Sequence, residues 1–259
     1  MPEGDTVHHA ARRIRPVLTG HVPDELRTPH PRFARDRWAE RLDGRAVTGV
    51  DALGKHLFLH FEDDLVIHSH LRMTGAWGVH PVGARWKRAP HRAWLVLRVG
   101  ATEVVQFGGP VLELMTAGRA RTDPRIAGLG PDILAEGELD DARVLRRLRE
   151  DDPTRTIGDA LLDQRTIAGL GTVWRTEACW AARIDPHRRT ADVRDAEVLE
   201  ALADVRPRMQ LSATTGFQAR QRTCYGRGGR PCPRCAATIR SGHLGDDNRP
   251  VFWCPGCQR

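Results

Sequence analysis

Apolar residues near the start of the chain recur at the spacing of an amphipathic helix. They are Val7, Ala10, Ala11, Ile14 and Leu18. Asp5 or Thr6 can accept a hydrogen bond from the first free backbone amides, and Gly20 can end the helix. Pro16 lies inside the pattern, where its missing amide should kink the helix or end it early. The chain is therefore expected to open with one helix.

The pattern changes between His21 and about Leu114, where short apolar or alternating runs are separated by Gly, Pro and Asp. Such runs predict β-strands. The expected strands cover residues 45–50, 56–61, 65–69, 77–80, 94–99, 103–107 and 111–114. Residues 62–64 predict a hairpin turn, and residues 53–55 predict a second turn that lifts Lys55 off the sheet. This half of the chain predicts a β-sandwich or barrel.

Helical patterns follow a stretch rich in Gly, Arg and Pro at residues 117–133, which reads as a linker. The expected helices cover residues 142–150, with Asp140 or Asp141 as the cap, 156–163, 172–182 and 195–205. No clear periodicity follows Pro207, and residues 212–216 read as a loop. The chain as a whole is thus predicted to be an α+β protein of several domains.

The turn before the helix at 172–182 contains Gly169 and Gly171 and leads into Thr172. Glycines let backbone amides approach a ligand closely, and a helix N-terminus favours phosphate. An ordinary helix–helix turn would have the same letters, so this motif is weak when taken alone.

Two CxxC motifs near the end of the chain are separated by 18 residues. They supply Cys232, Cys235, Cys254 and Cys257. Four thiolates at this spacing suit one tetrahedral Zn²⁺, and with no fifth ligand evident the metal should be structural. The residues between the motifs are expected to form a β-hairpin with its tip at 245–247. Cys179 and Cys224 lie outside the set and read as a core thiol and an incidental one.

The charge of the chain points to a polyanionic partner. The 259 residues are enough for two domains, and their formal net charge is +7. Residues 218–259 contain eight arginines and two aspartates, and 8 − 2 gives +6. Only Lys55 and Lys87 are lysines, which marks them as candidates for roles that arginine cannot fill. No apolar run is long enough to cross a membrane and no secretory leader is evident, so we expect a cytoplasmic protein.

Pro2 and Glu3 form a candidate reactive pair. Removal of Met1 would leave a secondary amine on Pro2, and terminal amines titrate near pKa ~7.7–8.0, so a useful fraction is unprotonated. Such an amine can attack a carbonyl or a sugar C1′ to give an iminium ion, while Glu3 supplies or removes protons. These letters alone also fit a common processed start with no chemical role.

Five short motifs follow one another along the chain. They are Pro2-Glu3-Gly4, Gly54-Lys55 on a turn, His70 to Gly75, the helical run from Leu162 to Glu177, and a four-cysteine hairpin that ends Trp253 to Gln258. Together they resemble the formamidopyrimidine-DNA glycosylase/endonuclease VIII family, and the resemblance extends over the whole chain. It implies a β-sandwich catalytic domain at 1–116, a linker at 117–139, a helix–two-turn–helix DNA-binding domain at 140–222 and a Cys₄ zinc finger at 223–259.

The resemblance also implies a role for each matching residue. Pro2 would form the Schiff base, Glu3 would act as acid and base, and Lys55 would contact the lesion strand and assist proton transfer. The expected DNA contacts are His70 and Arg249 at phosphates, Met73 as a wedge in the base stack, and the turn of Gly169, Gly171 and Thr172. The resemblance also implies that Arg249 takes part in catalysis. The expected partner is damaged DNA, bound by a monomer with no membrane association.

The sequence departs from the family pattern in two places. Thr172 stands where the family usually has asparagine, and Glu103 and Val105 stand where the purine-directed members have the aspartate and arginine of an Asp-x-Arg-x-Phe-Gly loop. Residues 215–225 are also too short for the loop that those members fold over 8-oxoguanine. The incomplete loop and the short segment, together with the Arg-Thr-Glu-Ala-Cys-Trp helix at residues 175–180, favour the endonuclease VIII branch and oxidised pyrimidines. An 8-oxoguanine or formamidopyrimidine enzyme and a non-catalytic zinc-ribbon nucleic-acid-binding protein are the alternatives.

Overall fold

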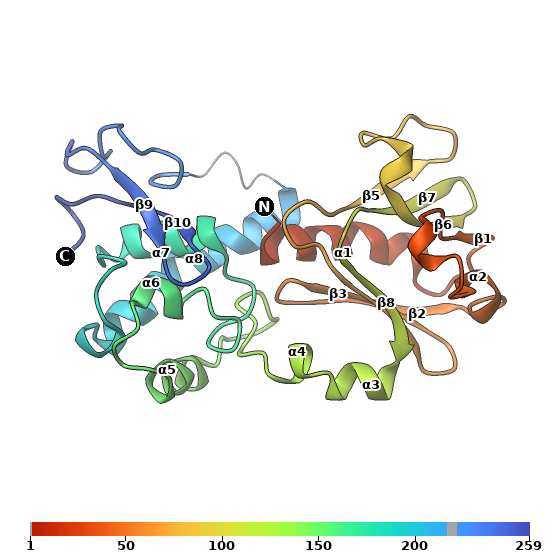
Figure 1. Cartoon of the computed structure of the whole chain (residues 1–259), viewed down its shortest axis with the longest axis horizontal. Coiled ribbons are helices and arrows are strands. Elements are labelled where there is room, and N and C mark those ends of the chain that lie inside the picture. Colours follow the sequence, from red (N-terminus) through yellow and green to blue (C-terminus); the bar gives the residue numbers. More distant parts are fainter. Residues whose placement is uncertain (1, 217–221) are drawn as a thin grey trace. The chain divides into compact units, whose positions relative to one another are not determined.

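The computed structural model describes residues 2–216 and 222–259 (Figure 1). Its contacts divide the chain into two compact units. The β-unit comprises Pro2 and Thr6–Ala127, and the helical unit comprises Glu3–Asp5 and Gly128–Arg259. Within the described ranges, no helix is long and apolar enough to cross a membrane.

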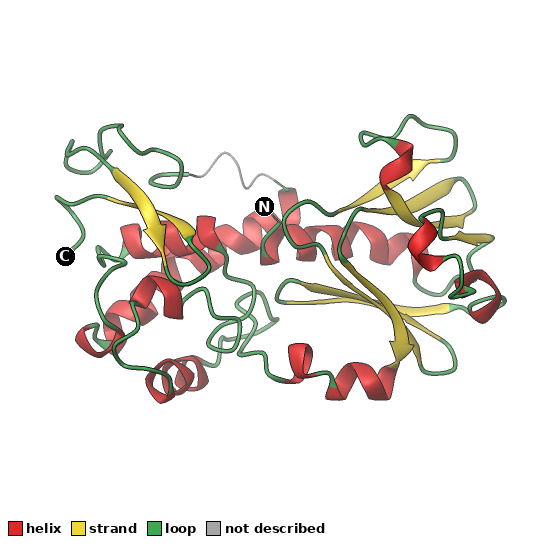
Figure 2. Ribbon diagram, viewed as in Figure 1, coloured by secondary structure: helices red, strands yellow, loops and turns green. Residues whose placement is uncertain are grey.

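The β-unit contains two antiparallel sheets, each with four strands among the described residues (Figure 2). One sheet has the order β1–β6–β7–β5, with β1 at Glu25–Arg27, β6 at Ala93–Val99, β7 at Thr102–Phe107 and β5 at Ala76–Pro81. The other has the order β2–β3–β4–β8, with β2 at Val47–Leu53, β3 at His56–Phe61, β4 at Leu65–His70 and β8 at Val111–Thr116. The predicted β-sandwich is therefore confirmed.

Helix α1 (Gly4–Leu18) fills the space between the two sheets (Figure 2). Ile14 and Leu18 are fully buried and belong to the same apolar cluster as Leu59 of one sheet and Leu97 of the other. The expectation that Pro16 could end the helix early is wrong, since the helix continues to Leu18. Burial of its last turn in the core outweighs the lost backbone hydrogen bond.

The two predicted turns in the β-unit are confirmed. Asp63 and Asp64 join β3 to β4 with φ of 55° and 57°, a left-handed pair that suits a two-residue hairpin turn. Gly54, with φ of +57°, joins β2 to β3 and is followed by Lys55. The turn therefore places Lys55 at the end of the sheet.

The segment expected to be a linker, 117–139, begins with two short helices that periodicity did not predict. They are α3 (Ala117–Thr122), capped by the Thr116 side chain, and α4 (Pro124–Ala127). Helix α3 packs against β4 and β8, below the sheet in the view of Figure 1. Other short elements absent from the prediction are β1, α2 (Trp38–Arg41) and the 3₁₀ turns Pro31–Phe33, Pro90–Arg92 and Thr190–Asp192.

The helical unit is built on α5 (Asp141–Glu150), α6 (Ile157–Ala160), α7 (Thr172–Ala181) and α8 (Asp195–Thr215). Asp140 caps α5 with a side-chain oxygen, as predicted, and Thr156 caps α6 in the same way. The helix predicted at 156–163 is shorter in the structure, because α6 ends at Ala160. The loop expected at 212–216 is wrong, because α8 continues to Thr215. Met209 and Ala213 are buried in the core of the unit, so packing extends the helix beyond Pro207.

The chain ends in the predicted hairpin, formed by β9 (Arg240–Leu244) and β10 (Arg249–Trp253). Its tip rests on α6 through two glycines. A Cβ at Gly158 would lie 2.6 Å from the Leu244 side chain, and one at Gly245 would lie 2.2 Å from Asp159. The hairpin therefore packs as part of the helical unit.

Candidate functional site

Glu3 lies at the N-terminus of α7 and is fully buried. Its Oε1 accepts a hydrogen bond from the backbone N–H of Val173 at 2.8 Å, and its Oε2 accepts one from Trp174 at 3.3 Å. Two amide donors and the positive end of a helix stabilise the charged carboxylate. The residue bonded to Pro2 is thus a buried anion in a fixed position. The residue types do not indicate these two donors, which lie 170 and 171 positions away.

Gly169 and Gly171, in the turn before α7, allow the segment that carries Glu3 to lie close to the helix. The Gly4 N–H donates to the Gly169 carbonyl at 2.9 Å, and a Cβ on Gly171 would lie 2.3 Å from the Glu3 carboxyl carbon. The close partner of Gly169 and Gly171 in this structure is therefore the segment that carries Glu3. Thr172, the first residue of α7, is buried, and its carbonyl accepts the hydroxyl of Thr176. Phosphate binding by this turn stays a prediction.

Three other predicted site residues gather at one end of the β2–β3–β4–β8 sheet. His56 pairs with His70 across β3 and β4, which places the Lys55 turn beside the end of β4. Met73 follows in a turn and has an exposed fraction of 58%. Arg88 and Arg92 both donate to the Thr74 carbonyl, at 2.7 and 3.4 Å, and so hold this turn from the outside. Sequence reasoning missed both arginines.

His70 is a neutral imidazole near physiological pH. Burial, followed by the nearby charges of Arg72 and Lys55, lowers its pKa from 6.5 to about 4. Its Nδ1 accepts the backbone N–H of Arg72 at 3.2 Å, so the neutral ring carries its proton on Nε2. His70 can therefore offer an anion a hydrogen bond without a positive charge.

Around α7, a group of charged residues, three of them fully buried, ties distant segments together. We call Glu3, Arg175, Glu177 and Arg208 the α7 cluster. Arg175 is fully buried and donates to the carbonyls of Gly158 at 3.0 Å and Pro250 at 2.9 Å. Pro250 follows Arg249, which begins β10 and pairs with Asp247 at 3.2 Å. Arg175 thus fixes the strand that carries Arg249, a role that the sequence did not reveal.

Glu177 anchors the segment that leads into the hairpin. Its carboxylate accepts the backbone N–H groups of Thr223, Cys224 and Tyr225, at 2.8, 2.9 and 2.9 Å. The Arg208 guanidinium lies 3.0 Å from the same group. Glu177 is fully buried, and these partners satisfy its charge. The helix therefore holds the entry to the four-cysteine region at a defined place.

The four predicted metal ligands come together in the structure. Cys232, Cys235, Cys254 and Cys257 have sulfur atoms that all lie within 4.8 Å of one another. The Sγ–Sγ distances are 3.8 Å for Cys232–Cys257 and 3.4 Å for Cys235–Cys254. A tetrahedral zinc with bonds of about 2.3 Å requires sulfurs about 3.8 Å apart, whereas a disulfide requires about 2.05 Å. The donor set therefore fits Zn²⁺.

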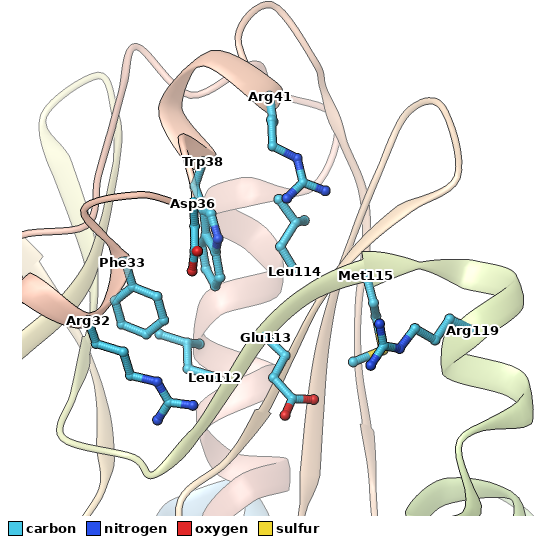
Figure 3. A pocket seen from close by; sticks show the side chains of 10 residues that line it. All are labelled: Arg32, Phe33, Asp36, Trp38, Arg41, Leu112, Glu113, Leu114, Met115 and Arg119. Carbon is cyan, nitrogen blue, oxygen red and sulfur yellow. The ribbon is translucent and has the colours of Figure 1, made fainter.

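A pocket of about 280 Å³ lies in the β-unit beside β8 (Figure 3). It is lined by Arg32, Phe33, Asp36, Trp38, Arg41, Leu112, Glu113, Leu114, Met115 and Arg119. No predicted site residue lines this pocket. Glu113 connects it to the interior, because its carboxylate lies 3.8 Å from Nδ1 of the buried His68.

Comparisons with known proteins agree with this arrangement. The model of the formamidopyrimidine-DNA glycosylase N-terminal domain matches residues 1–110, and that of the H2TH domain of the same glycosylase matches residues 129–221. A Streptomyces coelicolor protein named "Probable endonuclease 8 2" is 37% identical over 268 residues, which cover 100% of this chain and 94% of the relative. The chain belongs to the formamidopyrimidine-DNA glycosylase/endonuclease VIII family.

Other members of the family are similar over their full length. The "DNA-(apurinic or apyrimidinic site) lyase Nei2" of Mycolicibacterium smegmatis is 36% identical, covering 100% of this chain and 99% of the relative. A Lactococcus lactis formamidopyrimidine-DNA glycosylase, solved with DNA that contains an AP site, has a TM-score of 0.85 at 22% identity, with both chains covered completely. That likeness establishes a shared fold.

The structure accounts for Glu103 and Val105, the residues that depart from the family loop. Val105 is fully buried, and the Glu103 carboxylate binds Arg27 at 3.3 Å and the indole N–H of Trp86 at 3.2 Å. Both residues therefore serve the sheet as part of β7. The short segment 215–225 lies partly outside the described residues, and its bearing on lesion choice stays a prediction.

Proposed function

We propose that this chain is a bifunctional DNA glycosylase and AP lyase of base excision repair that removes oxidised bases, mainly pyrimidines. The observation that carries the proposal is the buried Glu3 carboxylate, fixed by the amides of α7 next in sequence to Pro2. The full-length relatives named endonuclease 8 support it. A zinc-ribbon protein that only bound nucleic acid would need neither residue.

The proposed reaction begins with the free amine of Pro2, once Met1 has been removed. The amine attacks C1′ of the damaged nucleotide as the base leaves with the electrons of the glycosidic bond and gains a proton. Opening of the sugar ring puts a proton on O4′ and leaves an iminium ion between Pro2 and C1′. Glu3 transfers these protons, because it is the carboxylate adjacent to the amine. Loss of a C2′ proton then expels the 3′ phosphate, and a second elimination expels the 5′ phosphate.

The damaged nucleotide must leave the helix before this attack, because C1′ is inaccessible within a stacked duplex. The exposed Met73 is proposed to fill the gap that the base leaves. Lys55, His70 and Arg249 are proposed to bind phosphates near the lesion, together with the turn of Gly169, Gly171 and Thr172. Lys55 also assists proton transfer. Support comes from the gathering of Lys55 with His70 and from the anchoring of β10 by Arg175.

Borohydride trapping tests the nucleophile and the lesion class together. Duplexes with thymine glycol, 8-oxoguanine or a preformed abasic site are incubated with the enzyme and reduced, and mass spectrometry locates the adduct. We expect an adduct on Pro2 and faster trapping on thymine glycol than on 8-oxoguanine, while Pro2→Gly slows or shifts the trapping. An adduct on Lys55 or Lys87 would overturn the assignment of Pro2, and faster trapping on 8-oxoguanine would overturn the lesion class.

We also propose that the four cysteines hold one structural Zn²⁺. The metal would lock the two CxxC turns at the base of the hairpin, which has a small core of its own. Metal analysis should find one zinc per chain, and a chelator should expose the hairpin amides to hydrogen exchange while the β-unit stays protected. Cys232→Ser combined with Cys254→Ser should lose the metal, and stoichiometric zinc in that variant would contradict the site.

The domain boundaries expected from the sequence remain proposals as well. Limited proteolysis should cut the chain within 117–139 or near 222, and size-exclusion chromatography should give the mass of a monomer. A dimer mass that persists at nanomolar protein would contradict the proposed monomer.

A further inference from the structure

The β2–β3–β4–β8 sheet has polar side chains on the face opposite the apolar core. We call His56, His68, Glu113, Arg125 and Asp123 the histidine cluster. His56 and His68 are buried, with Nδ1 of His56 only 2.7 Å from Nε2 of His68, and their rings stack at 5.0 Å. The His56 ring also meets the His70 ring edge-on at 4.7 Å. A continuous path therefore leads from the pocket residue Glu113 to His70.

The proton positions along this path can be assigned by starting from Glu113, the residue at the pocket. Arg125 binds the Glu113 carboxylate at 2.7 Å and lowers its pKa, so Glu113 is an anion. An anion near Nδ1 of His68 favours a proton on that nitrogen, which leaves Nε2 of His68 as an acceptor. The proton in the 2.7 Å hydrogen bond must then belong to Nδ1 of His56.

Burial, more than the surrounding charges, keeps the rings of His56 and His68 neutral. Burial is the largest cause, and it lowers the pKa of His56 to about 2 and also lowers that of His68. His70, His68, Arg125 and Arg72 act in the same direction as burial on His56. At His68, Arg125 also lowers the pKa, while Glu113 and Asp123 raise it. His56 and His68 are therefore hydrogen-bonding groups of fixed orientation at physiological pH.

We propose that His68 is a positioning residue, which through His56 fixes the ring of His70 and the adjoining Lys55 turn, so that His70 binds a DNA phosphate by an N–H donor that carries no charge. The inference rests on the proposed function for the presence of DNA. His56 is the link, since it follows Lys55 in the chain and packs against the His70 ring.

The first test reads the protons directly in the DNA-free protein. Long-range ¹H–¹⁵N spectra at pH 7 should show His56 and His68 protonated on Nδ1 and His70 protonated on Nε2, all neutral. A doubly protonated His70, or His56 protonated on Nε2, would overturn the proposal. This measurement needs neither a variant nor catalysis, so it can fail while the proposed function stands.

The second test measures binding to a duplex with a tetrahydrofuran abasic analogue, at several salt concentrations between pH 5.5 and 8. His68→Leu removes the acceptor of His56 and should weaken binding about fivefold, the effect of one ordinary hydrogen bond. It should also bring a pH dependence into this range, because a His70 ring that His56 no longer holds becomes less buried, and burial is the largest cause of its lowered pKa. His68→Gln restores an acceptor and should recover both properties.

His60→Leu is the matched control. His60 lies on the same face of β3, has a side chain that is 36% exposed and pairs with Asp51 at 3.2 Å, outside the cluster. It should leave binding and its pH profile unchanged. His70→Gln should weaken binding without altering the slope of log K against log[salt], since a neutral donor displaces no counterion. A slope reduced by about 0.9 in His70→Gln, or a His68→Leu profile identical to wild type, would overturn the proposal.

A wild-type protein that binds no damaged DNA would instead refute the proposed function.

Discussion

The histidine cluster and the α7 cluster both bury polar side chains, but they satisfy them with different partners. In the β-unit, imidazoles bind one another and a carboxylate, so each partner is a side chain. In the helical unit, Arg175 binds two backbone carbonyls, and Glu3 and Glu177 bind backbone amides. A backbone partner belongs to a particular chain segment, so these charges fix where distant segments lie. A side-chain partner can be replaced or can titrate, so the histidine cluster can respond to pH.

The largest expected effect breaks the α7 cluster. Glu177→Ala removes the acceptor of three amides and the anion beside Arg208, and should lower the free energy of unfolding by about 3–5 kcal/mol. Urea unfolding followed by tryptophan fluorescence measures the loss. Glu200→Ala, at an exposed position on α8, serves as the control and should cost less than about 0.5 kcal/mol. Equal losses in the two variants would show that the charge of Glu177 has no structural weight.

The next effect distinguishes the β-unit from the helical unit by the pH at which each loses stability. His56 has a folded pKa of about 2, below its usual 6.5, so its native state binds fewer protons and stability falls as the pH drops below 6.5. At pH 5.5 the loss is about 1.4 kcal/mol for such a histidine. In the helical unit, Arg188 lowers the pKa of Glu197 from 4.5 to about 2. The contribution of Glu197 to the stability of the fold is therefore lost only as the pH falls below about 4.5.

Hydrogen exchange at pH 7.5 and 5.5, compared at equal intrinsic rates, should therefore show weakened protection first in β3 and β4. Earlier loss of protection in α7 and α8 would reverse the comparison.

A third effect, of similar size, concerns the contact between α7 and the hairpin. Arg175→Met keeps the volume but leaves the carbonyls of Gly158 and Pro250 without their donor, at a cost of about 1–3 kcal/mol. We expect faster amide exchange in β9 and β10 and faster release of zinc to a chelator. Arg183→Met, on an exposed residue just after α7, is the control. Unchanged hairpin exchange in Arg175→Met would mean that the tip contacts at Gly158 and Gly245 suffice.

The smallest expected effect is a change in the salt dependence of DNA binding. Arg249→Ala should reduce the slope of log K against log[salt] by about 0.9 on duplex DNA, by a similar amount for two different lesions. Turnover should fall as well, because a misplaced sugar cannot meet Pro2. An unchanged slope with normal turnover would make Arg249 one exposed charge among several.

The sequence predicted those features that depend on local patterns. The strands of the sandwich, the turn at Asp63 and Asp64 and the four-cysteine site all follow from alternation, turn chemistry and ligand spacing. The end of α8 was missed because burial of Met209 and Ala213 extends the helix beyond Pro207. The partners of Glu3 were missed because backbone amides leave no trace in the residue types.

The distance along the chain between Glu3 and its amide donors has a consequence for the order of synthesis. Glu3 is among the earliest residues that the ribosome makes, whereas Val173 and Trp174 follow 170 and 171 positions later. The carboxylate cannot reach its native place until α7 has emerged and folded, which makes this contact one of high sequence separation and late formation. A nascent chain that has completed its β-sandwich therefore still lacks an ordered Glu3. The proposed chemistry at the neighbouring Pro2 becomes available only when most of the chain has been translated.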